Sequence, residues 1–411
     1  MYTELTSTVT DQDRALQRRA HEFAEQVLRP ASIALDALQP ADVIAEGSVL
    51  WDVFRQAYGE GWHVRNFPET LAGMGLGPLV SHMVNEELGW GSADFAVALS
   101  VCSFPFAFAA SRNDPEILRD IVRPFVLDRE ARYIGCWAIT EPDHGSDTLM
   151  PGTGTFTNPQ IQYGARAMLV GDEYVVDGQK SAWVSNGTIA THALVFLGVD
   201  RVRGMAGGGV ALVPLNLPGV SKGRPLDKLG QRALNQGEIF FDNVRIPRSY
   251  MLVEPDAYPL AIDAALAGAN AFMGAVFTGV ARAAFEEALA YAKSRVQGAA
   301  PICEHQLVQK KLFDMFIKVE SARQLSRAAM IHNSSAETPD TRYSIASKVY
   351  ATQSAFEVAS EAVQLHGGYG LVKGVLVEKL LRDARASLIE DGSNDILALT
   401  AAHKILERYT P

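Results

Sequence analysis

The sequence predicts a mainly α-helical protein with a central β domain, organised in three parts. Helical apolar spacing dominates residues 1–130 and 249–411, whereas residues 131–248 hold short alternating segments separated by Gly, Pro, Asn and Asp. At 411 residues the chain is too long for one small core. We therefore expect an N-terminal all-helical domain, a central antiparallel β domain and a C-terminal four-helix bundle.

The N-terminal part shows successive helix signals. Asp11 and Asp13 supply an N-cap and a negative first turn, and apolar spacing then continues to Leu28. Further helices are expected at residues 48–60, 79–89, 93–110 and 114–127. The segment 93–110 is almost wholly apolar, so we expect it to be buried.

The texture changes near Arg132 and again near Tyr250. Strands are expected at residues 133–138, 165–170, 173–176, 193–197, 210–214 and 238–241. Long helices are expected at residues 261–295, 306–333, 340–365, 375–389 and 394–409. Short links between long amphipathic helices are typical of an up-and-down bundle.

Composition narrows the classes of partner and compartment. The net charge of −10, from 47 acidic and 37 basic residues, argues against nucleic acid or an anionic membrane surface as the main partner. Cys102, Cys136 and Cys303 are far apart, so we expect no metal site and a reducing environment. We find no apolar run of about eighteen residues, and therefore expect no membrane span. The polar N-terminus is unlike a targeting signal, so the cytoplasm is the expected location.

Three stretches are candidates for ligand recognition. The first follows a predicted strand and runs from Trp137 through Ile139-Thr140-Glu141-Pro142 to Gly145-Ser146-Asp147, where glycine and serine allow a close backbone approach. The second is Lys180 to Gly187, in which Trp183 and Ser185, two apart on a predicted strand, would face the same side. The third is Gln364-Leu365-His366-Gly367-Gly368-Tyr369-Gly370, a helix C-cap and glycine-rich loop that matches neither a Walker loop nor a Rossmann fingerprint. Each has an ordinary structural alternative: a polar turn, a core tryptophan and a plain C-cap.

A fourth stretch, Glu390-Asp391-Gly392-Ser393-Asn394-Asp395, places carboxylates at a turn between two predicted helices. Backbone N–H groups at such a junction are available to a ligand. The alternative is a simple C-cap followed by an N-cap.

Together these stretches resemble the acyl-CoA dehydrogenase superfamily of flavoproteins, and the resemblance covers nearly the whole chain. It also includes Leu229-Gly230 with the segment 238–247 at the end of the β domain, and Arg295 with Glu304-His305-Gln306 in the bundle. The resemblance implies the same three-domain fold and an FAD bound between the β domain and the bundle. The implied flavin contacts in this sequence are Trp137, Ile139, Thr140, Gly145, Ser146, Trp183, Ser185, Ser393 and Asp395.

The resemblance further implies that Arg295, Gln297, Gln364, Gly367 and Gly368 reach the cofactor of a neighbouring subunit. A guanidinium fork such as that of Arg295 suits a pyrophosphate. A composite site implies a homotetramer or homodimer. Electron-transfer flavoprotein is the implied electron acceptor.

The resemblance places Asp391 where the family keeps its catalytic glutamate. It implies α-proton removal from an acyl-CoA thioester, with β-hydride transfer to the flavin, and substrate contacts at Ser146, Asp391 and Gly392. In a dry pocket the ionised carboxylate is disfavoured, so its pKa should rise toward working pH. Aspartate reaches roughly 1–1.5 Å less far than glutamate, which can cost on the order of a hundredfold in rate without compensation.

The same residues leave other bases and other chemistries open. Some relatives carry the base on the first bundle helix, but Ala269 aligns there and Asp263 is two turns away. Glu390 is expected to be a surface or subunit-contact carboxylate. Asp94 is a candidate second carboxylate for a cyclic acyl-CoA, although an N-cap is the more common role for it.

A nitroalkane oxidase or other flavin oxidase is the main alternative, because residues 279–289 resemble the bundle helix of the nitroalkane oxidases and their base is an aspartate. The arginine that accompanies that base is Ala398 here. A flavin monooxygenase generally lacks a carboxylate at position 391, and a non-catalytic protein with the same fold would lack responsive FAD. Residues 148–166 form a loop about ten residues longer than in the family; it either reshapes the mouth of the substrate channel or is a disordered surface insertion.

Overall fold

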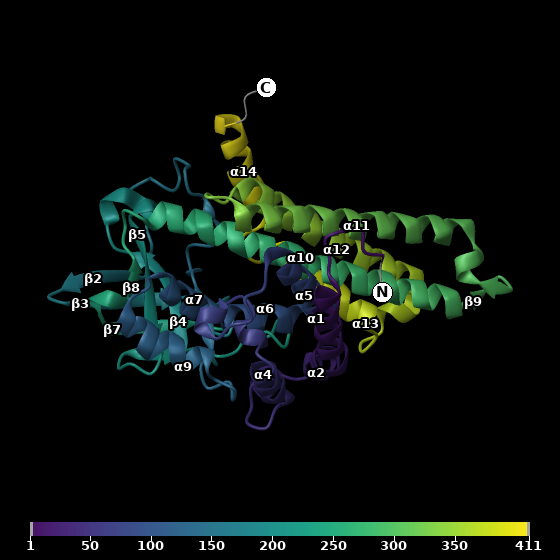
Figure 1. The fold of residues 1–411 in the computed structure, drawn as a ribbon, viewed down its shortest axis with the longest axis horizontal. Helices are drawn as coiled ribbons and strands as arrows, with labels where there is room; N and C mark the ends of the chain where they lie inside the picture. Colours follow the sequence, from purple (N-terminus) through teal and green to yellow (C-terminus); the bar gives the residue numbers. More distant parts are fainter. Residues whose placement is uncertain (1–2, 409–411) are drawn as a thin grey trace.

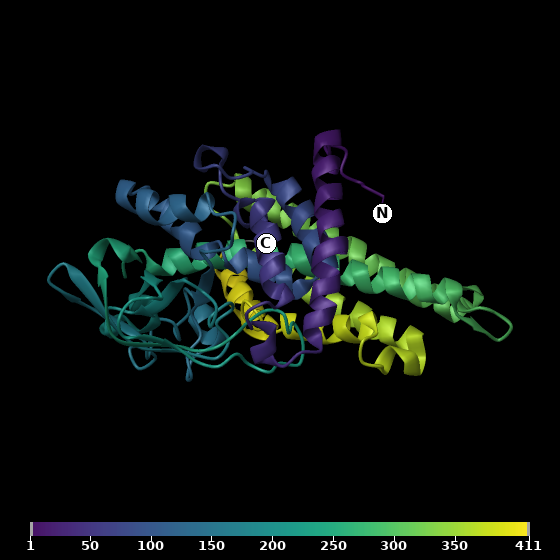
Figure 2. The ribbon, with the colours of Figure 1, turned by 90° about the horizontal axis from the view of Figure 1, so that it is seen from below.

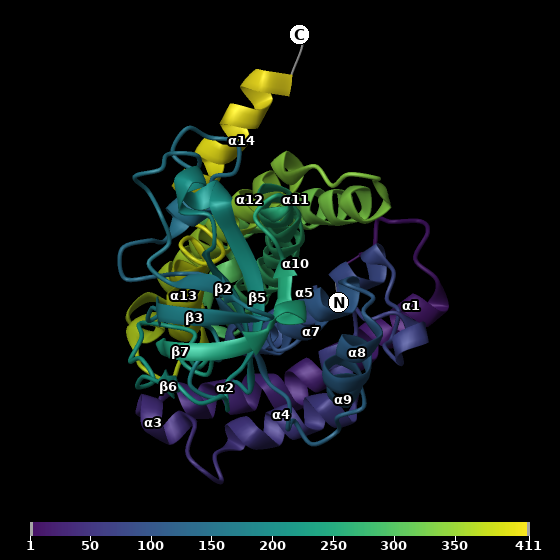
Figure 3. The same ribbon diagram turned by 90° about the vertical axis from the view of Figure 1, so that its left-hand side faces the viewer.

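The computed structural model describes residues 3–408 and contains the three predicted parts (Figure 1). The sheet lies at one end of the molecule, and the long helices of the bundle extend from it to the other end. Viewed along that direction, the sheet lies on one side of α10 (Tyr258–Ser294), and the N-terminal helices α1, α8 and α9 lie on the other (Figure 3). The predicted fold class is confirmed.

The N-terminal part is helical and compact. Its α-helices are α1 (Asp11–Phe23), α2 (Arg29–Asp36), α3 (Pro40–Val43), α4 (Val49–Gly59), α5 (Pro78–Gly91), α6 (Ala93–Val101), α7 (Phe104–Ser111), α8 (Pro115–Ile117) and α9 (Arg123–Val126). Single π-helical segments, Ala24–Leu28 and Leu118–Val122, join α1 to α2 and α8 to α9. Helix α1 crosses the long axis of the bundle (Figure 2).

The prediction of one continuous helix at 93–110 is wrong. The segment divides into α6 and α7 after Val101, and Pro105 lies in the first turn of α7. Proline cannot donate the backbone hydrogen bond that a continuous helix would need there. The burial expected for this segment is confirmed for α6, all of whose residues are buried.

The β domain is one sheet with the strand order β6-β7-β3-β2-β4-β5-β8, and β1 pairs with β4. The strands are β1 (Gly135–Ala138), β2 (Arg166–Val170), β3 (Glu173–Lys180), β4 (His192–Gly198), β5 (Gly208–Pro214), β6 (Val220–Lys222), β7 (Ile239–Pro247) and β8 (Met251–Val253). Most neighbours are antiparallel, but β1 and β2 each pair parallel with β4. The last strand, β8, lies beyond the domain boundary predicted at residue 248.

The C-terminal part consists of α10 (Tyr258–Ser294), α11 (Gln306–Ser335), α12 (Thr341–His366), α13 (Leu376–Ser387) and α14 (Asn394–Arg408). A short hairpin, β9 (Val296–Gln297) and β10 (Ala300–Pro301), caps the end that is farthest from the sheet (Figure 1). The predicted last helix extended to residue 409, which lies outside the described residues.

The expectation that the chain has no apolar run of membrane-spanning length is wrong, because two helical stretches reach that length. Ala93–Ser111 and Tyr258–Ser294 are long and apolar enough by length and composition alone, but 72% and 67% of their most apolar windows are buried inside the protein. A core helix surrounded by other elements needs this composition.

Helix α10 packs so closely on α5 that two positions admit only glycine. A Cβ added to Gly279 would lie 2.0 Å from the Glu86 carbonyl oxygen, and one added to Gly89 would lie 2.1 Å from that of Val276. Both obstacles are backbone atoms, which cannot rotate away. The small residues of α10 therefore set the distance between the N-terminal helices and the bundle.

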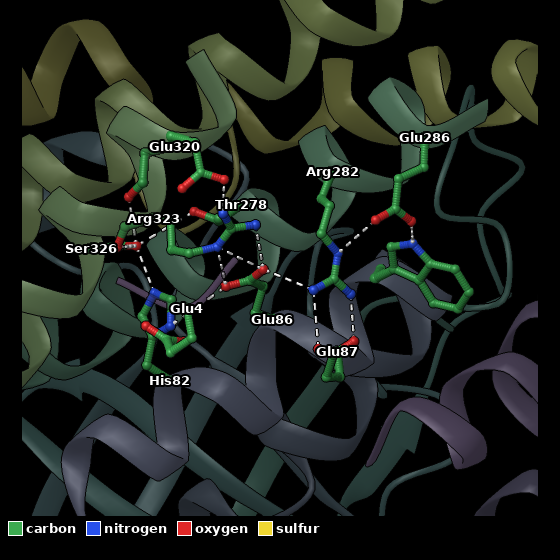
Figure 4. Close-up of polar contacts among 12 residues, drawn as sticks. Glu4, His82, Glu86, Glu87, Thr278, Arg282, Glu286, Glu320, Arg323 and Ser326 are labelled. Carbon is green, nitrogen blue, oxygen red and sulfur yellow. Dashed lines mark hydrogen bonds and ion pairs between the residues drawn. The ribbon is translucent and has the colours of Figure 1, made fainter. Parts of the chain in front are cut away.

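A buried network of charges joins the same two helices (Figure 4). Arg282 on α10 donates to Glu86 and Glu87 on α5, each at 3.0 Å, and Arg323 on α11 donates to Glu86 at 2.9 Å. Burial by itself would raise the pKa of Glu87, but the charge of Arg282 outweighs it and holds that pKa at about 2. Each carboxylate is thus ionised and paired inside the core.

Replacing Arg282 with methionine should lower the free energy of unfolding by roughly 3–5 kcal/mol, because it leaves buried carboxylates without their partner. Chemical unfolding of the purified variant measures this. The control is Arg203→Met, which removes the 2.7 Å pair with Asp256, a side chain that is 98% exposed. The control should change the free energy by less than about 1 kcal/mol. Equal effects of the two substitutions would contradict the assignment of stability to the buried network.

Candidate active site

The turn between α13 and α14 carries the predicted base. Helix α13 ends at Ser387 and α14 begins at Asn394, and between them Asp391 and Gly392 have φ angles of +50° and +97°. Aspartate and glycine tolerate this left-handed region better than most residues. Lys348 on α12 donates from Nζ to the carbonyl oxygen of Gly392 and to Oδ1 of Asn394, both at 2.7 Å. A buried lysine therefore fixes the backbone of the turn through these hydrogen bonds.

The charges at this turn influence one another. Burial raises the pKa of Asp391 to about 6, and the positive charge of Lys348 partly opposes that rise. Burial lowers the pKa of Lys348 to about 8, against the opposite influence of Asp391 and Glu390. A carboxylate with this pKa is ionised at neutral pH yet basic enough to accept a proton.

The backbone of the turn offers donors and a direct link to the β domain. The N–H of Asp391 has no acceptor within the described residues. The N–H of Ser393 donates to Oγ of Ser146 at 2.9 Å. The structure therefore brings the first predicted flavin loop into contact with the turn that carries the predicted base.

The first flavin loop follows β1 and is tied to β3. Lys180 donates from Nζ to the carbonyl oxygen of Ile139 at 3.0 Å and to Oε1 of Glu141 at 2.6 Å. Thr140 accepts the backbone N–H of Ser181 on its carbonyl oxygen. These bonds place Thr140, half-buried, on the rim of the loop that ends at Gly145 and Ser146.

The second flavin stretch is not a strand, which corrects the prediction for residues 180–187. Strand β3 ends at Lys180, and positive φ angles at Ala182 and Asn186 interrupt the extended backbone that alternation requires. Trp183 is 57% exposed, whereas Ser185 is half-buried and its Oγ accepts Nε2 of Gln236 at 3.1 Å. Ser185 forms an isolated bridge to Trp137, so it still lies beside the first flavin loop.

The remaining predicted contacts lie at the far end of the bundle. Arg295, Gln297, Gly367 and Gly368 line one cleft of about 580 Å³ between the end of α10 and the end of α12. Gln364, exposed on α12, precedes the cleft residue Leu365. The Gly367 C-cap has a φ of +59°, as predicted for the glycine-rich loop. One chain thus holds two separate groups of predicted FAD contacts.

Both groups have features that fit FAD. The indole Nε1 of Trp137 is buried and has no partner within the described residues, as a group awaiting an acceptor would be. Arg295 is exposed, lines the cleft and has no carboxylate partner among the described residues, so its guanidinium is available to a phosphate. The other predicted contact near the turn, Asp395, is exposed in the first turn of α14.

Asp94 is fully buried and occupied by other groups. Its carboxylate accepts Oγ of Ser32 at 2.9 Å and the backbone N–H of Ala233 at 3.1 Å, and Lys379 lies 3.4 Å away. The N-cap role predicted for it is wrong, because Ser92 caps α6 by accepting the N–H of Phe95. A substrate contact for Asp94 stays a prediction.

Two further expectations change. Glu390 is half-buried rather than on the open surface, and its Oε2 accepts a hydrogen bond from Nε2 of the buried Gln231 at 2.6 Å. Its alternative role as a subunit contact stays a prediction. The loop at 148–166 is ordered rather than a disordered insertion, since Phe156 stacks parallel to Tyr258 and the hydroxyls of Tyr163 and Tyr258 lie 2.5 Å apart.

The start of this loop reaches the turn that carries the candidate base. A Cβ on Gly392 would lie 3.1 Å from Cδ1 of Leu149, and Thr400 on α14 donates to the Leu149 carbonyl oxygen at 3.4 Å. A role of the loop in shaping the mouth of the substrate channel stays a prediction.

Lys348 and Gln231 are functional candidates that the sequence did not reveal. Lys348 lies on a long helix whose spacing predicts only a buried stripe of small residues, and a lysine there reads as a solvent-exposed side chain. Gln231 lies in an irregular segment that has no periodicity. The only signal for either residue would have been the three-dimensional position of the turn.

The comparisons with known proteins agree with this geometry. The sequence matches the acyl-CoA dehydrogenase N-terminal domain over residues 10–110, the middle domain over 136–244 and the C-terminal domain over 261–406. The short-chain specific mitochondrial acyl-CoA dehydrogenase of Bos taurus is 32% identical over 96% of this chain and 90% of its own length. Cyclohexane-1-carbonyl-CoA dehydrogenase of Geobacter metallireducens is 28% identical over 97% of this chain and 98% of its own.

Solved structures show the same relationship. Butyryl-CoA dehydrogenase from Megasphaera elsdenii superposes with a TM-score of 0.85 and 26% identity, covering 98% of this chain and all of the other. The predicted family and the FAD cofactor are thereby confirmed. The chain belongs to the acyl-CoA dehydrogenase family, the FAD-dependent oxidoreductases that act on a CH–CH bond of an acyl-CoA.

Proposed function

We propose that the protein dehydrogenates an acyl-CoA thioester to the enoyl-CoA with Asp391 as the catalytic base. Asp391 accepts the α-proton, the β-hydrogen leaves as hydride, and the electron pair of the broken α-C–H bond forms the new double bond. Bound FAD supplies the hydride acceptor. The observation that carries the proposal is the turn itself, where a carboxylate with a raised pKa is joined to the flavin loop through Ser146.

The same turn supports polarisation of the thioester carbonyl. An α-C–H is a weak acid until negative charge on the carbonyl oxygen is stabilised. The N–H of Asp391, which lacks an acceptor within the described residues, is a donor suited to this oxygen. Because the carboxylate and the N–H belong to the same residue, they can act together on the α-carbon and on the adjacent carbonyl oxygen of the substrate.

A fixed backbone at the turn can compensate for the shorter reach of the aspartate side chain. Lys348 holds the carbonyl oxygen of Gly392, and Ser146 holds the N–H of Ser393, so the two residues after the base are fixed from opposite sides. A preorganised turn limits the loss that a missing methylene would otherwise cause. The alternative base Asp263 is less suited, because its carboxylate pairs with Lys404.

We also propose that the functional unit is a homotetramer or a homodimer. The flavin loop near Ser146 and the cleft around Arg295 lie at different ends of the bundle, which supports a cofactor shared between two chains. Exposed apolar side chains on α11 supply a surface for association; they are Leu307, Phe313, Phe316 and Ile317. Electron-transfer flavoprotein as electron acceptor, and the cytoplasm as location, are proposals that rest on the sequence.

The Asp391→Asn variant should bind acyl-CoA and FAD but reduce the flavin at least about a hundredfold more slowly, because the amide cannot accept the α-proton. Anaerobic stopped-flow absorbance, with a panel of straight, branched, cyclic and aryl acyl-CoAs, measures the rate. Asp263→Asn is the control and should stay within about threefold of the parent protein. Near-normal reduction by Asp391→Asn would remove this residue from its role.

The rate of flavin reduction by saturating acyl-CoA should rise with pH through about 6 and then level off. The base must be ionised, and burial has raised its pKa to about 6, so at pH 5 only about a tenth of it is active. Single-turnover reduction from pH 5 to pH 8 tests this. A midpoint near 4, the ordinary value for an aspartate, would contradict the buried environment assigned to Asp391.

The Arg295→Ala variant should retain at least tenfold less FAD after gel filtration, because it removes the guanidinium from the cleft. The flavin absorbance per chain gives the occupancy. Arg245→Ala is the matched control: this exposed arginine pairs with Glu173 on the sheet, and its loss should leave FAD content unchanged. Equal FAD content in the two variants would exclude a cofactor role for the cleft.

A further inference from the structure

Glu390 is the residue beside the base, and its surroundings are unlike those of a structural carboxylate. It is half-buried, and the only hydrogen bond of its carboxylate within the described residues is the one from Nε2 of Gln231 to Oε2, at 2.6 Å. A carboxylate removed from water normally takes several donors, because its lone pairs are costly to leave unpaired. Its second oxygen, Oε1, has no donor in the described chain.

The amide of Gln231 adds a second acceptor to the same place. Its Nε2 donates both to Glu390 and to the carbonyl oxygen of Asp383, at 3.2 Å, so the nitrogen must face these two acceptors. That orientation leaves Oε1 of Gln231 buried without a donor, in a residue that is 1% exposed. Buried amide oxygens in native proteins are rarely left in this state.

The nearby lysines do not satisfy these oxygens. Lys228 directs its Nζ to the carbonyl oxygens of Gln231 and Leu234 and to Oε1 of Gln236, at 2.7–3.0 Å. Lys348 is engaged by Gly392 and Asn394, and Lys379 pairs with Asp383 at 2.5 Å and lies 3.4 Å from Asp94. Three cations therefore surround the site, and none of them makes an ion pair with Glu390.

We propose that Glu390 and Gln231 recognise a hydrogen-bond-donating substituent, a hydroxyl or an amino group, on the acyl chain of the substrate. This inference rests on the proposed function, in which the α-carbon lies at Asp391. With the α-carbon at Asp391, acyl atoms beyond the α-carbon are proposed to lie beside Glu390. Oε1 of Glu390 and Oε1 of Gln231 both lack a donor within the described residues.

The site also disfavours an unsubstituted chain. A plain methylene placed against Glu390 would remove water from its half-buried carboxylate and return no hydrogen bond, and it would leave the buried Oε1 of Gln231 without a donor. Enzyme sites built to bind a hydroxyl or amino group discriminate strongly against analogues that lack it, for this reason. The preference should therefore be visible as a difference in specificity between matched substrates.

The test uses the FAD-containing protein and matched acyl-CoA pairs of four to six carbons, with and without a terminal hydroxyl or amino group. Anaerobic flavin reduction gives the rate constant and the apparent Kd for each pair. At least one substituted acyl-CoA should exceed its unsubstituted partner by tenfold or more in the ratio of rate to Kd. The Glu390→Leu variant should lose this preference. Its flavin should still be reduced by unsubstituted acyl-CoA at least as efficiently as in the parent protein.

Glu238→Leu is the matched control. Glu238 is also half-buried and also accepts a glutamine amide, Nε2 of Gln179 at 3.1 Å, but it belongs to the β domain. It should keep the parent preference. Gln231→Leu, checked for FAD content and melting temperature, should weaken the preference in the same direction as Glu390→Leu.

The outcomes separate this inference from the proposed function. Flavin reduction by unsubstituted acyl-CoAs without any preference for substituted ones would overturn the role of Glu390 and leave the dehydrogenase proposal standing. A preference that survives in Glu390→Leu would also overturn it. No reduction by any acyl thioester would instead contradict the proposed function itself.

Discussion

The hydrogen bonds from Lys348 to the turn that carries the candidate base Asp391 are the interaction on which the geometry of the proposed site depends. A lysine is rarely buried without a carboxylate partner. The ammonium group of Lys348 instead donates hydrogen bonds to the carbonyl oxygen of Gly392 and to the side chain of Asn394. Those bonds fix the backbone on the C-terminal side of Asp391, where both φ angles are positive. The same ammonium group moderates the pKa of the base, so geometry and basicity share one cause.

The position of Lys348 in turn depends on how the bundle is held against the N-terminal helices. Helix α10 packs on α5 at backbone contact through Gly89 and Gly279, and Arg282 pairs with Glu86 and Glu87 at the same interface. Helix α12 packs along α10, so its placement follows from that interface. Small residues and buried ion pairs at this interface thus help to set the position of the candidate base.

The turn also joins parts of the chain that are distant in sequence. Ser146 from the β domain and Leu149 from the long loop both contact it, and Gln231 contacts its glutamate. A catalytic carboxylate built on a turn is mobile unless neighbouring elements restrain it. Here the restraint comes from all three of the sheet loop, the extended loop and helix α12.

The fold and the flavin motifs were predictable because they depend on local pattern. Apolar periodicity distinguishes the long helices from the short strands, and the family motifs are contiguous residues such as those from Thr140 to Ser146. The candidate base rests on the same kind of local signal, since Asp391 precedes Gly392 and Ser393 in one short run, and its role stays a prediction. The break between α6 and α7, and the irregular backbone around Trp183, were missed because spacing alone does not report dihedral angles.

By itself the sequence determined the three-part architecture, the family, the cofactor and the identity of the candidate base. Only the tertiary structure decided the surroundings of that base: that Glu390 faces Gln231 rather than solvent, that Asp94 is occupied by Lys379 and its serine neighbours, and that a lysine lies beneath the turn. The physical reason is that these contacts join residues 44 to 285 positions apart in the sequence. No period or motif encodes such pairings; they arise only when helices and sheet pack to a common core.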